Sequence, residues 1–210
     1  MKNALIVVDV QNDFCEGGAL EVKNGNEVIP VINKLVNSKK FDFIIATQDW
    51  HPRNHKSFAS NHKNKNVYDV IELNGIMQVL WPDHCIQRTK GARFHSELNL
   101  GKKYYVFKKG KNPNIDSYSG FYENDHKTST GLAEFLKKNN IETVYITGLA
   151  TDYCVKFTAI DSVREGFKTF VIKDAVKGVN INKDDSKKAF NEMKDKGCKI
   201  ITSKRILNHS

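Results

Sequence analysis

The apolar residues of this chain form short runs that alternate with segments of helical periodicity. The short runs predict six strands, at residues 4–10, 41–47, 104–107, 143–147, 169–172 and 199–202. Apolar residues three or four positions apart predict four helices, at residues 27–38, 129–139, 153–165 and 183–196. Strands rich in valine and isoleucine that alternate with helices typically form a parallel sheet buried on both faces. The pattern therefore predicts an α/β fold with such a sheet at its centre.

The stretch from residue 48 to residue 100 does not follow this alternation. It is rich in tryptophan, proline, histidine and asparagine, and its periodicity is weak. A disordered insert is one interpretation, but the large side chains of Trp50, Phe58 and Trp81 argue against it. Long loops inside compact domains usually carry function, so we expect a metal-site region here. The pattern predicts no shape for residues 54–74.

Length and composition fit one globular domain over residues 1–210. A content of 40% hydrophobic and 27% charged residues is ordinary for such a chain. No segment approaches the roughly 20 apolar residues that cross a membrane, and the apolar run at residues 4–8 is short for a signal peptide. The four cysteines are widely spaced without a C-x-x-C pair, which argues against a disulfide framework or a zinc ribbon. We therefore expect a cytoplasmic protein.

The net charge of +9 raises the question of a nucleic-acid partner. The lysines are scattered, and no helix-turn-helix, zinc finger or aromatic RNA-binding motif accompanies them. Because lysine-rich solvated surfaces are common, we expect neither a nucleic-acid nor a membrane partner. The sequence leaves open whether the chain is a monomer or a homo-oligomer.

Residues with catalytic chemistry follow the predicted strands. They are Asp9 at the end of the first, Asp49 and His51 after the second, Lys109 after the third and Cys154 after the fourth. Because ligands gather at the carboxyl ends of parallel strands, we expect these side chains to converge. A thiol in the first turn of a helix lies near the positive end of the helix dipole, which lowers its pKa and favours the nucleophilic thiolate. The alternative for Cys154 is a small buried side chain.

Asp49 and His51 stand two positions apart, so in an extended segment both side chains point the same way. His84 could supply a third ligand, and carboxylate with imidazole suits zinc, iron or manganese. His55 competes for this role, but Pro52 disfavours the helix that would align it with His51, so we expect His55 to orient a ligand. The simple alternative is that the D-x-H pair arises by chance.

An acid, a cation and three aromatic side chains complete the candidates. Burial would raise the pKa of Asp9 and a cation such as Lys109 would lower it, so that the carboxyl could exchange a proton with a thiol. The alternatives are a loop residue for Asp9 and a solvated charge run for Lys109. The loop residues Phe14, Trp81 and Tyr118 either form a flat slot for a ring or only pack the loops.

Five motifs occur in the order and approximate spacing of a known family. They are DVQNDF at 9–14, DWHP at 49–52, WPDHC at 81–85, KG at 109–110 and GLATDYCV at 148–155. On these motifs the chain resembles the nicotinamidases of the isochorismatase-like cysteine hydrolase superfamily. The resemblance implies a three-layer α/β/α fold with a central, mainly parallel, doubly wound sheet of six strands. Lys109 is preferred to Lys108 as the family's lysine because it directly precedes Gly110.

The resemblance also implies a reaction, the hydrolysis of nicotinamide to nicotinate and ammonia through a cysteine thioester, as a step of NAD salvage. Pyrazinamide would enter the same slot. A cis peptide bond between residues 149 and 150 is implied as well. The implied site consists of the triad Asp9, Lys109 and Cys154, the Zn²⁺ (or Fe²⁺ or Mn²⁺) ligands Asp49, His51 and His84, the oxyanion-hole N–H groups of Ala150 and Cys154, and the ring-binding Phe14, Trp81 and Tyr118.

Three other functions share part of these features. A metal-free amidohydrolase of the same superfamily, acting on a ureido or carbamoyl compound, would keep Asp9, Lys109 and Cys154 without the metal ligands. An isochorismatase that hydrolyses an enol ether generally lacks the nucleophilic cysteine. A binding protein that kept the fold without catalysis would not need an acid, a lysine and a thiol at three strand ends.

Overall fold

The computed structural model describes residues 1–208 and contains a six-stranded sheet in the order β5-β2-β1-β6-β7-β8. All neighbouring strands in it are parallel. The strands are β1 (Lys2–Val8), β2 (Phe43–Asp49), β5 (Tyr105–Lys109), β6 (Ile141–Leu149), β7 (Lys168–Lys177) and β8 (Lys199–Ile201). Each predicted strand is present, and the prediction of a parallel central sheet is confirmed.

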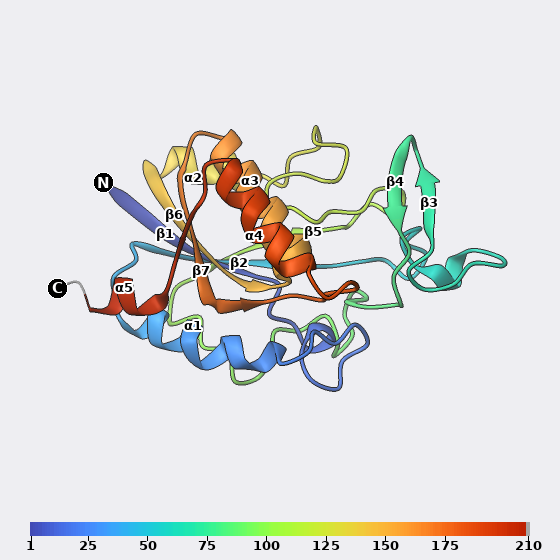
Figure 1. Ribbon diagram of the computed structural model, residues 1–210, viewed down its shortest axis with the longest axis horizontal. Coiled ribbons are helices and arrows are strands. Elements are labelled where there is room, and N and C mark those ends of the chain that lie inside the picture. Colours follow the sequence, from blue (N-terminus) through green and yellow to red (C-terminus); the bar gives the residue numbers. More distant parts are fainter. Residues whose placement is uncertain (209–210) are drawn as a thin grey trace.

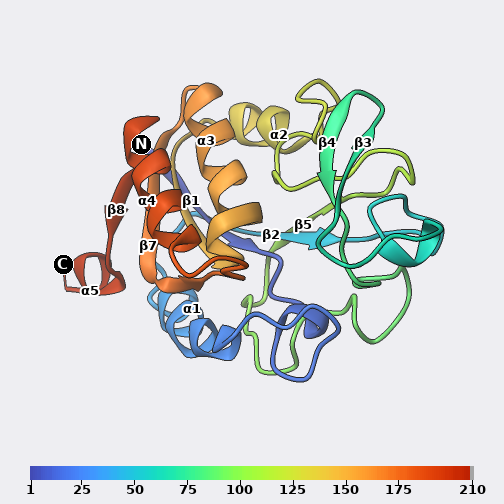
Figure 2. The same cartoon turned by 45° about the vertical axis from the view of Figure 1, so that its right-hand side comes forward.

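Helices cover both faces of this sheet, which confirms the three-layer prediction (Figures 1 and 2). One face carries α1 (Val28–Asn37) and α5 (Ser203–Leu207), and the other carries α2 (Leu132–Lys138), α3 (Lys156–Arg164) and α4 (Asp185–Asp195). In α1 the buried residues form the single apolar stripe that a helix packed on a sheet requires: Val28, Ile29, Ile32, Leu35 and Val36. Within the described residues, no helix is both long and apolar enough to span a bilayer.

The central strand β1 contributes to the cores on both faces. Leu5 and Val7 belong to the core against α1, whereas Ala4, Ile6 and Val8 belong to the core against α2, α3 and α4. Successive side chains of a strand point to opposite faces, so a strand covered on both sides must be apolar at every position. This explains why the sequence shows an unbroken apolar run here instead of an alternating pattern.

Two helices begin differently from the prediction. The helix predicted from residue 153 starts with a π-helical turn, η4 (Thr151–Val155), and continues as α3. The helix predicted from residue 129 starts only at Leu132, because Gly131 has a φ of +90°, outside the helical region. Short 3-10 turns that the pattern did not predict are η1 (Asn12–Phe14), η2 (Gly25–Glu27) and η3 (Ala59–Asn61).

A two-stranded antiparallel hairpin also lies outside the prediction. It consists of β3 (Val70–Leu73) and β4 (Ile76–Val79) and projects at the end of the molecule to which β2 points (Figure 1). The connecting residues Asn74 and Gly75 have φ values of +53° and +78°. An Asn-Gly pair favours this kind of turn, so the pair was the available sequence signal for the hairpin.

Candidate active site

Four polar side chains meet at the carboxyl edge of the sheet. Asp9 directly follows β1, Asp49 and Lys109 end the paired strands β2 and β5, and Cys154 lies in η4 after β6. These strands are neighbours in the sheet, and all four residues are buried. The parallel order therefore gathers residues that are far apart in the sequence.

The ammonium group of Lys109 lies at the centre of this cluster. Its Nζ is 2.9 Å from Asp9 Oδ2, 2.5 Å from Asp49 Oδ1 and 3.4 Å from Cys154 Sγ. It also donates a hydrogen bond to the Ser117 carbonyl oxygen at 2.7 Å. Lys108 is exposed instead, with its Nζ 3.7 Å from the centre of the Trp50 indole ring system. The structure thus brings together the acid, the lysine and the thiol, with Lys109 as the lysine.

The two carboxyl groups of the cluster differ in pKa. Burial raises the pKa of Asp9 above its ordinary value of 3.8, although Lys109 and a 2.7 Å hydrogen bond from Thr47 Oγ1 oppose this. Burial acts in the same direction on Asp49, but there Lys109 and His51 outweigh it and hold the pKa below the ordinary value. Neighbouring acids with separated pKa values can take different roles. Asp49 stays ionised, while Asp9 is the group suited to exchange a proton.

The thiol of Cys154 differs from the sequence expectation. Burial raises its pKa well above the usual value of 9.0, and the lowering effect of Lys109 does not compensate. The expected lowering by a helix start is therefore wrong here, because desolvation disfavours the charged form of a buried group. A buried neutral thiol needs a base to become a nucleophile, and a carboxylate oxygen of Asp9 lies within 4.8 Å of Sγ.

A second cluster adjoins the first through Asp49. The Oδ2 atom of Asp49 is 3.5 Å from His51 Nε2 and 3.9 Å from His84 Nε2. The Nδ1 atoms of the two imidazoles lie 2.9 Å and 2.7 Å from the carbonyl oxygens of Gly110 and Pro82, respectively. Because a carbonyl only accepts, each Nδ1 carries a proton, and in the neutral form of each ring Nε2 keeps its lone pair. Both lone pairs and one carboxylate oxygen are then available to a common ligand.

This donor set fits a divalent metal ion. The three donor atoms lie within 4.8 Å of one another, and His51 Nε2 is buried without a hydrogen-bond partner. One carboxylate and two imidazoles, each with a hydrogen-bonded Nδ1, suit zinc, iron or manganese. Burial lowers the pKa of His84, whereas Asp49 raises that of His51 despite burial. A metal ion and a proton therefore compete for His51 Nε2.

His55 packs beside this cluster and not within it. Its ring centre is 4.4 Å from that of His51, and its Nδ1 is 2.7 Å from Ser57 Oγ. Burial lowers its pKa to about 4, so the ring is neutral near pH 7. His55 and Asp116 also lie with His51 in a second set of possible ligands. The expected orienting role of His55 remains a prediction.

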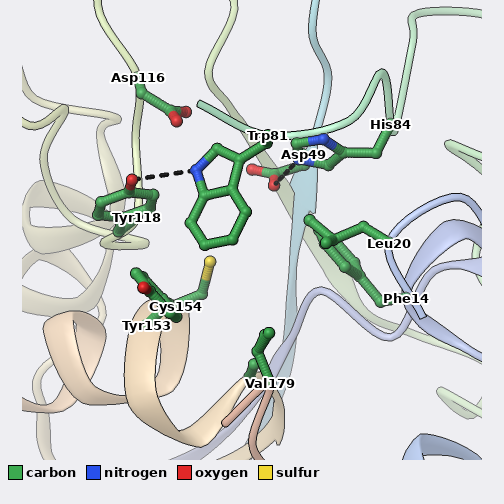
Figure 3. A pocket seen from close by; sticks show the side chains of 11 residues that line it. Phe14, Leu20, Asp49, Trp81, His84, Asp116, Tyr118, Tyr153, Cys154 and Val179 are labelled. Atoms are coloured by element: carbon green, nitrogen blue, oxygen red, sulfur yellow. Dashed lines mark hydrogen bonds and ion pairs between the residues drawn. The ribbon is translucent and has the colours of Figure 1, made fainter. Parts of the chain in front are cut away.

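An aromatic pocket of about 360 Å³, counting its open mouth, leads to both clusters. In Figure 3 the sulfur of Cys154 points into it toward Trp81, with Tyr118 on one side and Phe14 on the other. The Trp81 indole N–H donates to the Tyr118 hydroxyl at 3.1 Å. The lining residues are Phe14, Leu20, Asp49, Trp81, His84, Asp116, Tyr118, Ala150, Tyr153, Cys154 and Val179. The structure thus brings the three predicted aromatic residues to one cavity.

The backbone at the floor of the pocket also matches an expectation. The peptide bond between Leu149 and Ala150 is cis, as the resemblance implied. Ala150 and Cys154 both line the cavity.

Sequence reasoning missed several residues of this site. Tyr153 and Val179 line the pocket. Tyr153 directly precedes Cys154, and Val179 follows β7. The expectation that ligands bind at the carboxyl ends of parallel strands could therefore have included both residues. Thr47 ends the strand predicted at residues 41–47, so the same signal applied to it. No comparable signal marked Leu20 or Asp116. Their contribution depends on how loops and strand ends meet.

Known proteins resemble this chain over nearly its whole length. The isochorismatase domain model matches residues 3–205. A nicotinamidase of Acinetobacter baylyi is 50% identical over 97% of this chain and 94% of its own. A solved nicotinamidase/pyrazinamidase of Acinetobacter baumanii shares 48% identity and a TM-score of 0.94, with 98% of each chain covered.

Two further solved structures hold ligands. The yeast nicotinamidase bound to the inhibitor nicotinaldehyde shares 32% identity and a TM-score of 0.91, over 95% of this chain and 99% of its own. A pyrazinamidase of Pyrococcus horikoshii in complex with zinc shares 38% identity and a TM-score of 0.79, over 96% and 99%.

Proposed function

The chain belongs to the isochorismatase domain family, and we propose that it is an amidase that hydrolyses nicotinamide to nicotinate and ammonia. The observation that carries the proposal is the contact of Lys109 with both Asp9 and Cys154, the residue whose thiol lines an aromatic pocket. Relatives named nicotinamidases, one of them bound to nicotinaldehyde, support the substrate. A metal-free amidohydrolase would not need the second cluster, so its compact donor set favours the metal-dependent reaction.

The proposed first half of the reaction forms a thioester. Asp9 accepts the thiol proton of Cys154, and Lys109 stabilises the resulting thiolate. The sulfur bonds to the carboxamide carbon, and an electron pair moves to the carbonyl oxygen. The N–H groups of Ala150 and Cys154 donate to this oxyanion, and such a donor contributes roughly 3–4 kcal/mol in comparable sites. Asp9 then protonates the nitrogen, the C–N bond breaks and ammonia leaves.

Water completes the proposed cycle. The ionised Asp9 accepts a proton from the water molecule that attacks the thioester carbon, the C–S bond breaks, and the sulfur regains its proton. Phe14, Trp81 and Tyr118 hold the pyridine ring over Cys154 throughout.

Asp49, His51 and His84 would hold the metal ion. Zinc is the proposed ion, with iron or manganese as alternatives that accept the same ligands. When bound, it would supply a Lewis acid for the pyridine nitrogen.

The proposal extends to the use of the product. Nicotinate is a pyridine acid that can be returned to NAD, so we assign the reaction to NAD salvage in the cytoplasm. Pyrazinamide has the same planar carboxamide, and relatives named pyrazinamidases support it as a second substrate.

The test is ammonia release from nicotinamide, with a carbamoyl amino acid as the alternative substrate and elemental analysis of the same preparation. We expect release from nicotinamide alone and about one divalent metal ion per chain. His84→Ala should lose the metal, whereas His62→Ala, outside both clusters, should keep it. Release only from the carbamoyl compound would overturn the substrate, and full metal content in His84→Ala would overturn the ligand set.

A further inference from the structure

The side-chain amide of Gln11 forms hydrogen bonds with both the N–H group and the carbonyl oxygen of the Asp49 backbone. Its Nε2 donates to the carbonyl oxygens of Asp49 and Ala92, each at 2.9 Å. Its Oε1 accepts a hydrogen bond from the Asp49 N–H at 2.8 Å. Gln11 is fully buried, so its amide is committed to these protein partners.

The backbone of Asp49 needs these bonds because β1 and β2 end at different levels of the sheet. β1 ends at Val8, and its pairing with β2 reaches Ala46, whereas β2 continues to Asp49. The end of β2 therefore lacks a strand neighbour on the β1 side. Buried backbone groups without partners are costly, and the Gln11 amide occupies the place that the missing strand leaves.

Asp49 needs a defined orientation because its two carboxylate oxygens have different partners. Oδ1 lies 2.5 Å from Lys109 Nζ, and Oδ2 faces the Nε2 atoms of His51 and His84. A rotation that improved one set of contacts would weaken the other. The backbone of Asp49 must therefore be fixed if the carboxylate is to serve both clusters.

We propose that Gln11 is a positioning residue that fixes Asp49 for metal binding. The inference rests on the metal site of the proposed function. Hydrogen-bond partners of metal ligands typically change metal affinity by about 10- to 100-fold. Gln11 acts in this way on the backbone of the carboxylate ligand, without touching the ion.

The test compares two glutamines that share a partner. Gln11→Met keeps the length of the side chain and removes all three hydrogen bonds. Gln48→Met is the matched control, because Gln48 is also buried and donates to the same Ala92 carbonyl at 2.8 Å. Zinc affinity of each full-length protein is measured by competition with a chromophoric chelator. We expect about 10- to 100-fold weaker binding in Gln11→Met and an affinity close to wild type in Gln48→Met.

The outcomes separate this inference from the proposed function. If wild type binds zinc and Gln11→Met binds it equally well, the inference fails and the proposed function stands. An equal loss in both variants would assign the effect to general packing and would also overturn the inference. A wild-type protein that binds no divalent metal overturns both the inference and the proposed metal site.

A second variant covers the case in which Gln11→Met does not fold. Gln11→Glu keeps the size of the side chain and an acceptor for the Asp49 N–H, but it loses both donors. We expect weaker zinc binding together with slow hydrogen exchange of the Asp49 amide. Wild-type zinc affinity in this variant would contradict the inference.

Discussion

At the scale of single residues, the site depends on one buried cation. Burial lowers the pKa of a lysine, but Asp49 and Asp9 outweigh this effect at Lys109 and raise its pKa well above the usual value of 10.5. The ammonium therefore stays charged near neutral pH. Its removal would leave two buried carboxylates without their shared counter-ion, and breaking a buried pair in this way is strongly destabilising.

Replacing Lys109 should therefore affect both stability and activity. We expect Lys109→Met to lower the free energy of unfolding by roughly 3–5 kcal/mol and kcat/KM for nicotinamide by at least about 100-fold. Urea denaturation and steady-state kinetics measure the two effects. Lys108→Met is the control, because Lys108 is exposed over Trp50. Equal effects of the two substitutions would contradict the central role of Lys109.

The acid limb of the pH–rate profile should respond to Thr47. Asp9 must be ionised to act as a base, so activity falls as the pH drops through its pKa. The Thr47 hydroxyl lowers that pKa by donating to Asp9 Oδ1. Thr47→Val should consequently move the acid limb of kcat/KM to higher pH, while Thr169→Val, a buried substitution away from the site, should not move it. If the acid limb of kcat/KM does not move in Thr47→Val, Asp9 is not the base whose pKa determines that limb.

The sequence could predict which chemical groups meet, because Asp9, Asp49, Lys109 and Cys154 all lie at or just beyond the carboxyl ends of parallel strands. It could not predict the protonation of Cys154, since desolvation of the sulfur depends on its burial in the folded protein. The hydrogen bonds between Gln11 and the Asp49 backbone were also not predictable, because they depend on β1 ending earlier than β2.

At the scale of secondary-structure elements, the β3–β4 hairpin supports one wall of the pocket. Gln78 on β4 is buried, and its Nε2 donates to the Tyr118 hydroxyl at 2.9 Å and to Asp116 Oδ2 at 3.1 Å. An isolated two-stranded hairpin is marginal in water, so these bonds tie the hairpin to the body. The pattern missed the hairpin because β3 and β4 are only four residues each and partly exposed.

Removing the tie should loosen substrate binding more than it changes the chemistry. Gln78→Leu removes the donor of Asp116 Oδ2 and leaves the Tyr118 hydroxyl with the Trp81 N–H alone. Loss of a buried donor typically costs about 1–3 kcal/mol. We expect KM for nicotinamide to rise several-fold with a smaller change in kcat. Met77→Ala, on the same strand but 69% exposed, should leave both constants unchanged. A Gln78→Leu enzyme with wild-type KM would show that the hairpin does not shape the slot.

At the scale of the whole molecule, the site depends on the close pairing of β1 with β6. Asp9 follows β1 and Cys154 follows β6, so this pair sets the distance between acid and thiol. Gly148 of β6 pairs with Val8, and a Cβ at this glycine would lie 2.0 Å from the Val8 carbonyl oxygen. Apolar runs alternating with helices were sufficient to predict the sheet. The crowding at Gly148 was not predictable, because it depends on the distance between two backbones.

Substitution of Gly148 should accordingly disturb the fold. Gly148→Ala combines a φ of +104° with backbone overlap, and strain and overpacking each cost about 1–3 kcal/mol. We expect a loss of roughly 3 kcal/mol or more in the free energy of unfolding, measured by urea denaturation. Gly131→Ala is the control, since Gly131 has a φ of +90° and open space around it. A similar loss in both variants would mean that φ alone, and not the β1–β6 contact, requires glycine.

The central claim is that the sulfur of Cys154 carries out the covalent step beside a separate metal site. Ammonia release from nicotinamide by Cys154→Ala, assayed together with its metal content, tests this claim most directly. The account predicts no turnover above background with the metal content of wild type, whereas Cys198→Ala, a buried cysteine far from the pocket, stays active. Turnover by Cys154→Ala at a rate near that of wild type would contradict the account.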